Sequence, residues 1–127
     1  GGALAIGDEF AGDGADAVLD LLRPSYALYI GGMGARGKNF YNDLCVRYGY
    51  PDAAKEIQDL YLDGKRDEAA AAVPRQLLVD TNLVGPRSVV AERLVALESA
   101  GVTHCQVIPL TPDPVATIGE LRALTAA

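Results

Sequence analysis

The residues best suited to ligand chemistry lie in and just after a glycine-rich segment, residues 31–37. Four of its seven residues are glycine, so the backbone must turn sharply there or approach another group closely. A loop of this kind would present polar and flexible side chains to a ligand: Met33, Arg36, Lys38 and Asn39. It lacks the Lys-Ser/Thr ending with which a P-loop binds phosphate. Two interpretations stay open, a loop that wraps a ligand and a plain turn between helices.

A second group of candidates follows the predicted strands, because ligands of parallel α/β folds bind at the carboxyl ends of strands. Arg87 and Ser88 come after a short strand at the start of a helix. They could bind an anion, since the first N–H groups of a helix and its dipole attract negative charge. The pattern favours a plain helix start over an anion site. Asp8 and Glu9 follow the first strand and could serve as a base or simply be solvated.

The single histidine and the two cysteines point to structural roles. His104 lies near the start of a predicted strand, at the end opposite the expected ligand site. Cys105 is predicted to point to the other face of that strand as a small core residue, and Cys45 to lie on the apolar side of a helix. These three residues do not form a Cys/His zinc pattern, so no metal site is predicted.

The elements that would position these residues follow from the spacing of apolar residues. Short apolar runs predict strands at Ala3–Ile6, at 82–86 and, most clearly, at Val102–Leu110. Helical spacing, proline starts and glycine stops predict the helices. These begin at Asp16 with a break at Pro24, at Phe40 behind an Asn39 cap, at Pro51, Asp67, Pro74 and Ser88, and after Pro112.

The order strand, helix, strand, helix at the end of the chain is typical of parallel βαβ units and predicts the α/β class. Only about three strands are predicted in the whole chain. A parallel sheet needs both faces covered and its edges protected. The residues alone therefore leave two architectures open: a small open sheet, and one end of a larger repetitive barrel.

Composition narrows the function. The 127 residues are 50% hydrophobic and 22% charged, as expected for one globular unit. With 11 basic and 17 acidic side chains, the net charge of -6 argues against a nucleic-acid partner. The longest stretch without Asp, Glu, Lys or Arg has 14 residues, short of the roughly 20 that a membrane helix needs. The absence of a disulfide pattern and of a leader favours a cytoplasmic location.

Three segments, taken together, carry a family resemblance: RPSYALYIGGMG at 23–34, NFY at 39–41 and LVGP at 83–86. They resemble the luciferase-like monooxygenase family, in particular its actinobacterial branch of oxidoreductases that use the deazaflavin coenzyme F-420. The similarity runs from about Ala3 to Leu110.

The resemblance implies a fold and a place within it. Family members are (β/α)8 TIM barrels of well over 300 residues, and the similarity covers only their C-terminal part. It implies that the chain, residues 1–127, is a single unit from the end of that barrel. Ala3–Ile6 would end strand six, residues 16–80 would be a helical insertion, and residues 82–127 would form the last βαβα units, with strand seven at Leu83-Val84 and strand eight at Thr103–Pro109.

The implied activity is hydride transfer between coenzyme F-420, or alternatively FMN, and a small organic substrate. Because most cofactor contacts in the family come from earlier strands, the chain alone is expected to be inactive, and no catalytic residue is assigned. The residues implied for the substrate or cofactor pocket are Gly31, Gly32, Met33, Gly34, Asn39, Phe40 and Tyr41.

The implied incompleteness also predicts partners. A partial barrel would expose apolar flanks, so we expect the chain to form a homo-oligomer or to recruit the missing N-terminal part of the barrel. A different function stays open: a stand-alone, non-catalytic binding or assembly module derived from the end of the barrel. Such a module would be a closed three-stranded structure that does not bind flavins.

Overall fold

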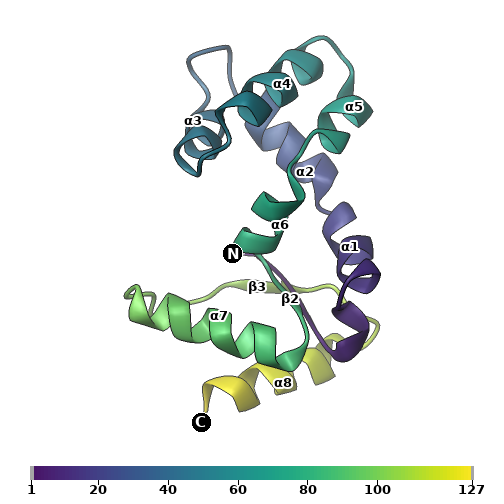
Figure 1. The fold of residues 1–127 in the computed structure, drawn as a ribbon, viewed down its shortest axis with the longest axis vertical. Coiled ribbons are helices and arrows are strands. Elements are labelled where there is room, and N and C mark those ends of the chain that lie inside the picture. Colours follow the sequence, from purple (N-terminus) through teal and green to yellow (C-terminus); the bar gives the residue numbers. More distant parts are fainter. Residues whose placement is uncertain (1, 127) are drawn as a thin grey trace. The chain divides into compact units, whose positions relative to one another are not determined.

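The structure is a computed structural model and describes residues 2–126. It divides into two compact units. Unit 1 contains the chain up to Leu19 and again from Val79 onward, and unit 2 is Asp20–Leu78. The elements, in chain order, are β1 (Gly2–Ile6), η1 (Asp8–Phe10), α1 (Asp13–Asp20), α2 (Arg23–Ala27), η2 (Leu28–Gly32), α3 (Phe40–Arg47), α4 (Pro51–Leu62), α5 (Arg66–Ala71), α6 (Arg75–Thr81), β2 (Leu83–Gly85), α7 (Arg87–Ser99), β3 (Val107–Pro109) and α8 (Pro114–Thr125) (Figure 1).

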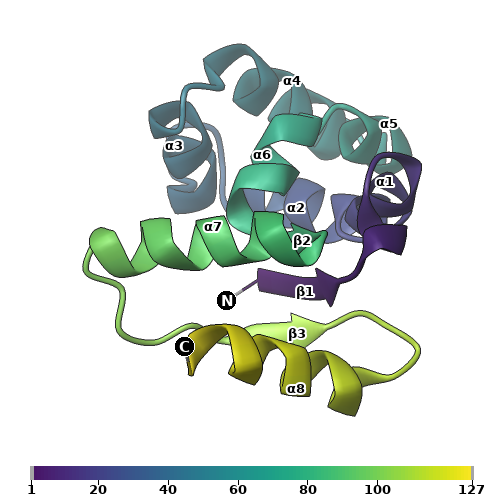
Figure 2. The ribbon, with the colours of Figure 1, turned by 60° about the horizontal axis from the view of Figure 1, so that its bottom comes forward.

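Unit 1 is built on a parallel three-stranded sheet with strand order β2-β1-β3. Leu4 of β1 pairs with Leu83 of β2, and Ala3 pairs with Ile108 of β3. Parallel strands joined by helices confirm the expected α/β class. Figure 2 shows α7 and α8 running alongside these strands.

The strand order differs from the order implied by a barrel. In a (β/α)8 barrel consecutive strands are neighbours, so strand seven would lie between strands six and eight. Here β1, which the resemblance equates with strand six, lies between β2 and β3. The described chain offers no other strand for the second edge of β1. In this order β1 is paired on both edges, while β2 and β3 each keep one edge without a strand partner among the described residues.

The predicted strand Val102–Leu110 is much shorter in the structure, where β3 covers only Val107–Pro109. In the parallel pairing of β1 with β3, Val107 is the partner of Gly2. Residues 102–106 are exposed. The prediction that Cys105 is a core residue is therefore wrong, and His104 lies in an exposed segment rather than inside a strand.

One hydrophobic cluster of unit 1 joins the sheet to α7 and α8, while Ala3 and Ala5, which alternate with Leu4 along β1, are buried as well. Leu4, Leu83 and Val90 are buried there, and partly buried residues of α7, α8 and the strands pack around them: Ile6, Leu94, Leu97, Val107, Leu121 and Leu124. Burying this apolar surface is the main force that holds the helices on the sheet. The first half of α8 contributes little, because Val115 is 81% exposed.

Unit 2 is entirely helical in its regular structure, and its helices begin where sequence signals predict. Pro24 stands in the first turn of α2 and Pro51 in the first turn of α4, positions at which the missing N–H costs nothing. Buried side chains from several helices form its interior: Ala27, Ile30, Cys45, Ala54, Ile57, Ala69 and Val73. The burial of Cys45 confirms its predicted position.

One boundary was predicted wrongly. The sequence predicts a loop from Gly31, but Gly31 and Gly32 form the end of η2, a π-helical turn. The loop proper comprises residues 33–38, and we call it the glycine loop. No helix within residues 2–126 combines the length and the apolar character needed to cross a membrane.

Candidate functional site

The glycines of the predicted motif hold η2 against α4. A Cβ atom on Gly31 would lie 2.6 Å from the Cβ atom of Tyr61 and 3.0 Å from the carbonyl oxygen of Ile57. A Cβ atom on Gly32 would collide with the Tyr61 ring. Real Cβ atoms do not approach so closely, so both positions need glycine. The structure thus gives Gly31 and Gly32 a packing role between two helices.

Asn39 joins the end of η2 to the start of α3. Its side chain is 1% exposed. The Nδ2 atom donates to the carbonyl oxygens of Tyr29 and Ile30, at 3.0 and 3.1 Å. The Oδ1 atom accepts from the backbone N–H of Asn42, at 3.0 Å, which confirms the predicted N-cap. Both amide hydrogens and the oxygen are thus engaged inside the protein, so Asn39 positions its neighbours.

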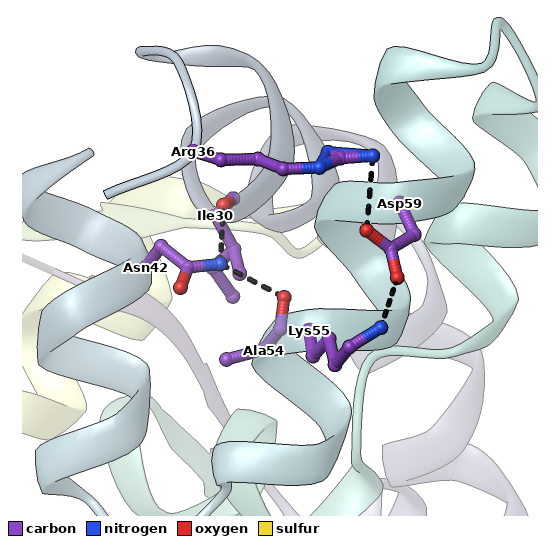
Figure 3. Close-up of polar contacts among 6 residues, drawn as sticks. All are labelled: Ile30, Arg36, Asn42, Ala54, Lys55 and Asp59. Atoms are coloured by element: carbon purple, nitrogen blue, oxygen red, sulfur yellow. Dashed lines mark hydrogen bonds and ion pairs between the residues drawn. The ribbon is translucent and has the colours of Figure 1, made fainter. Parts of the chain in front are cut away.

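Asn42 makes a second connection that sequence reasoning missed. Its Nδ2 atom donates to the carbonyl oxygen of Ile30 at 3.0 Å and to that of Ala54 at 2.8 Å. Figure 3 shows this side chain lying between the two carbonyl groups. η2, α3 and α4 are therefore linked by two asparagine side chains. The sequence does carry a sign of this buried role. Asn42 stands three positions after the cap and three before the buried Cys45, so the two residues share a face of α3.

Arg36 anchors the glycine loop to α4 through Asp59. The Arg36 guanidinium lies 3.0 Å from one Asp59 oxygen, and the Lys55 ammonium lies 2.6 Å from the other (Figure 3). The hydrogen bond from Lys55, together with the positive charges of Lys55 and Arg36, holds the pKa of Asp59 below its ordinary value of 3.8. Lys55 and Asp59 are spaced i, i+4, a signal readable from the sequence.

Three aromatic side chains gather beside the base of the glycine loop. Tyr29 and Tyr41 meet edge to face with ring centroids 4.8 Å apart, and Phe40 and Tyr41 do so at 5.4 Å. All three are exposed, Phe40 by 66%. We call these three residues the aromatic patch. Met33, in the loop, is also exposed, while Gly34 lies close against the backbone of Lys38 and Asn39.

A buried donor of α4 has no protein partner. The Nε2 atom of Gln58 makes no hydrogen bond, although its side chain is among the buried ones of unit 2. Buried unpaired donors are uncommon in folded proteins. This unpaired amide group lies on α4, the helix that also carries Asp59.

Arg87 and Ser88 lie in unit 1, at the start of α7 and just after β2. Pro86 precedes the helix without a side-chain cap, so the first N–H groups of α7 are not satisfied by a capping side chain. The Arg87 side chain forms an ion pair with Glu120 of α8. The start of α7 therefore has the chemistry of an anion site, although the charge of Arg87 is shared with a carboxylate. Within residues 2–126, no cluster of three His, Cys, Asp or Glu side chains could hold a metal ion.

Comparisons with known proteins agree with the motif resemblance. A family model described as luciferase-like monooxygenase matches residues 9–104. A putative coenzyme F-420-dependent oxidoreductase of Mycobacterium tuberculosis is 36% identical over 103 residues, which cover 81% of this chain and 29% of that relative. No solved structure matches the chain. The chain thus spans less than a third of the curated relative, and it belongs to the luciferase-like monooxygenase family.

Proposed function

We propose that this chain is the C-terminal part of a luciferase-like oxidoreductase that transfers hydride between coenzyme F-420 and a small organic substrate. The observation that carries the proposal is the 36% identity to a relative whose name states F-420 dependence. In this proposal unit 2 contributes the substrate side of the pocket. The aromatic patch supports that role, because exposed rings held on a tightly hydrogen-bonded base are suited to binding an organic ligand.

The residues of this chain fit one portion of the coenzyme. F-420 and FMN both carry phosphate, and the uncapped start of α7 offers backbone N–H groups of Arg87 and Ser88 at the carboxyl end of β2. When bound, the coenzyme would supply the hydride-transferring ring. We assign no residue of this chain to that ring, and we expect its contacts to come from the earlier strands of the barrel.

A titration tests the coenzyme proposal. The longer protein that contains this chain should bind F-420 at micromolar concentration, measured by the change in coenzyme fluorescence, whereas the chain alone should bind neither F-420 nor FMN. An Arg87→Ala, Ser88→Pro double variant of the longer protein should weaken coenzyme binding. Micromolar binding by the chain alone would overturn the expectation that most contacts lie elsewhere. Binding of FMN with no binding of F-420 would overturn the choice of coenzyme.

We further propose that the isolated chain associates, either with a second copy or with the missing N-terminal barrel part. β2 and β3 each have one edge with no strand partner among the described residues, and Ile108 of β3 is 61% exposed. Exposed edges and apolar residues of this kind favour pairing with another chain. Light scattering should report a species larger than a monomer, and a compact monomer would contradict the proposal.

The alternative, a non-catalytic binding or assembly module, is favoured by one observation. β1 lies between β2 and β3, so the sheet of unit 1 does not have the strand order of a slice of a (β/α)8 barrel. This function would be supported if the isolated chain unfolds in one cooperative transition and the longer protein binds no flavin or deazaflavin.

A further inference from the structure

We propose that the aromatic patch and the glycine loop form a binding site for a small molecule that joins a planar apolar ring to an anionic group. In this site the Arg36 guanidinium binds the anionic group of the ligand and gives up its ion pair with Asp59. The inference deepens the proposed function, on which it rests for treating this surface as the substrate side. Its binding step needs no coenzyme and is tested without one.

The ring would bind to the aromatic patch. Tyr29, Phe40 and Tyr41 meet edge to face, at 4.8 and 5.4 Å between centroids, so they expose ring surface that they do not cover for one another. Each is at least 42% exposed. A planar apolar ligand would bury that surface and add ring-to-ring contacts.

The base of the patch is already ordered. Asn39 ties the carbonyl group of Tyr29 to the start of the helix that carries Phe40 and Tyr41. Asn42 links the same region to α4. Because these groups are positioned before binding, the ligand would lose less affinity to ordering the protein.

Arg36 is held in a way that lets it exchange partners. Its ion pair with Asp59 lies at the surface, where the two side chains are 58% and 40% exposed, and exposed pairs of this kind are weak. Asp59 keeps the closer Lys55 ammonium, at 2.6 Å, when Arg36 departs. Neither charge is left alone, since Arg36 would gain the ligand anion while Asp59 retains Lys55.

The loop that carries Arg36 is fixed at its ends, and a hydrogen bond from the Lys38 N–H to the Ala35 carbonyl oxygen, at 2.9 Å, closes the turn within it. Gly37 has φ of 76°, the left-handed conformation that favours glycine, and a Cβ atom there would meet nothing within 4 Å. The loop leaves η2 and returns at Asn39, whose side chain closes it against Tyr29 and Ile30. Figure 1 shows this connection between η2 and α3. Arg36 precedes Phe40 by four residues in the sequence.

Two fluorescent probes separate the two halves of the site. 8-Anilinonaphthalene-1-sulfonate has an aromatic ring system and an anionic group, and N-phenyl-1-naphthylamine has similar rings without the charge. Phe40→Ala should weaken binding of both probes. Arg36→Gln should weaken the sulfonate about fivefold, the scale of one exposed charge contact, and leave the neutral probe unchanged. Asp59→Asn should strengthen the sulfonate, because Arg36 no longer has to leave a carboxylate.

Arg47→Gln is the matched control. Arg47 is exposed and lies in the last turn of α3, at the end opposite Phe40, so the variant removes the same charge from another part of unit 2. Equal effects of Arg36→Gln and Arg47→Gln on sulfonate binding would show that net charge, rather than Arg36, is responsible and would overturn the proposal. So would Phe40→Ala variants that bind both probes normally. Circular dichroism of each variant checks that the fold is intact. Failure here with normal F-420 binding by the longer protein would leave the proposed function standing.

Discussion

Gly31 packs against Tyr61 with no space for a side chain, since a Cβ atom at Gly31 would lie 2.6 Å from the Cβ atom of Tyr61. Gly31→Ala should therefore push η2 away from α4. The expected loss is about 1–3 kcal/mol in the free energy of unfolding, the usual effect of overpacking an interior. Urea denaturation of the variant and the parent chain measures it.

Gly119→Ala provides the control for that experiment. Gly119 lies within α8, and a Cβ atom there meets nothing within 4 Å. Alanine stabilises a helix interior by about 1 kcal/mol relative to glycine, so this variant should be slightly more stable than the parent. If both alanine variants change stability in the same direction, the close contact at Gly31 is not the cause.

Asn39→Ala should cost about 2 kcal/mol in the free energy of unfolding, because the carbonyl group of Tyr29 loses this donor, that of Ile30 keeps only Asn42, and α3 loses its cap. Asn39→Asp separates the two contributions. It keeps an oxygen for the N–H of Asn42 but turns an acceptor toward the carbonyl groups of Tyr29 and Ile30. Thermal unfolding should show that aspartate does not restore the parent stability. Full restoration would mean that the cap alone matters.

The two cysteines should differ sharply in reactivity. Cys45 is buried, its Sγ atom lies 3.9 Å from the carbonyl oxygen of Tyr50, and burial raises the pKa of its thiol. Cys105 is exposed. Iodoacetamide at mildly alkaline pH should label Cys105 first and Cys45 only after unfolding, as read by peptide mass spectrometry. Comparable labelling rates in the native protein would contradict the burial of Cys45.

Asp59 should make stability depend on pH in the acid range. Its pKa is lower in the folded protein than the ordinary 3.8, mainly through the hydrogen bond from Lys55. The group therefore stabilises the fold above pH 3.8, and this contribution is lost as the pH falls through the folded-state pKa. The stability difference between the parent and Asp59→Asn, measured by denaturant titration, should shrink across that interval and with added salt. A difference that stays constant with pH would exclude this ionisation as its source.

The strand order gives a direct spectroscopic prediction. Backbone nuclear Overhauser contacts should connect β1 with both β2 and β3, including a pair between Ala3 and Ile108. Contacts between β2 and β3 should be missing. The opposite pattern would place the strands in barrel order.

Much of the secondary structure could be predicted from local signals. Pro51 begins α4, and Asn39 caps α3. Gly101, with φ of 90°, directly follows the C-cap of α7. These signals act within a few residues, through proline's fixed φ, side-chain caps and glycine's tolerance of positive φ. The family could also be predicted, because three short segments of consecutive residues, at 23–34, 39–41 and 83–86, carry its motif. The pairing of Asn39 with a backbone N–H three residues later is equally local.

The tertiary structure decided the rest, since those features depend on partners distant in the sequence. β3 is short and Cys105 exposed because pairing with β1 starts only at Val107. Gly31 is a packing residue because Tyr61, thirty positions later, lies against it. Arg36 has a carboxylate partner because α4 brings Asp59 to the glycine loop. Local propensity carries no information about such contacts. They form only when the packing of whole helices and strands selects which surfaces meet.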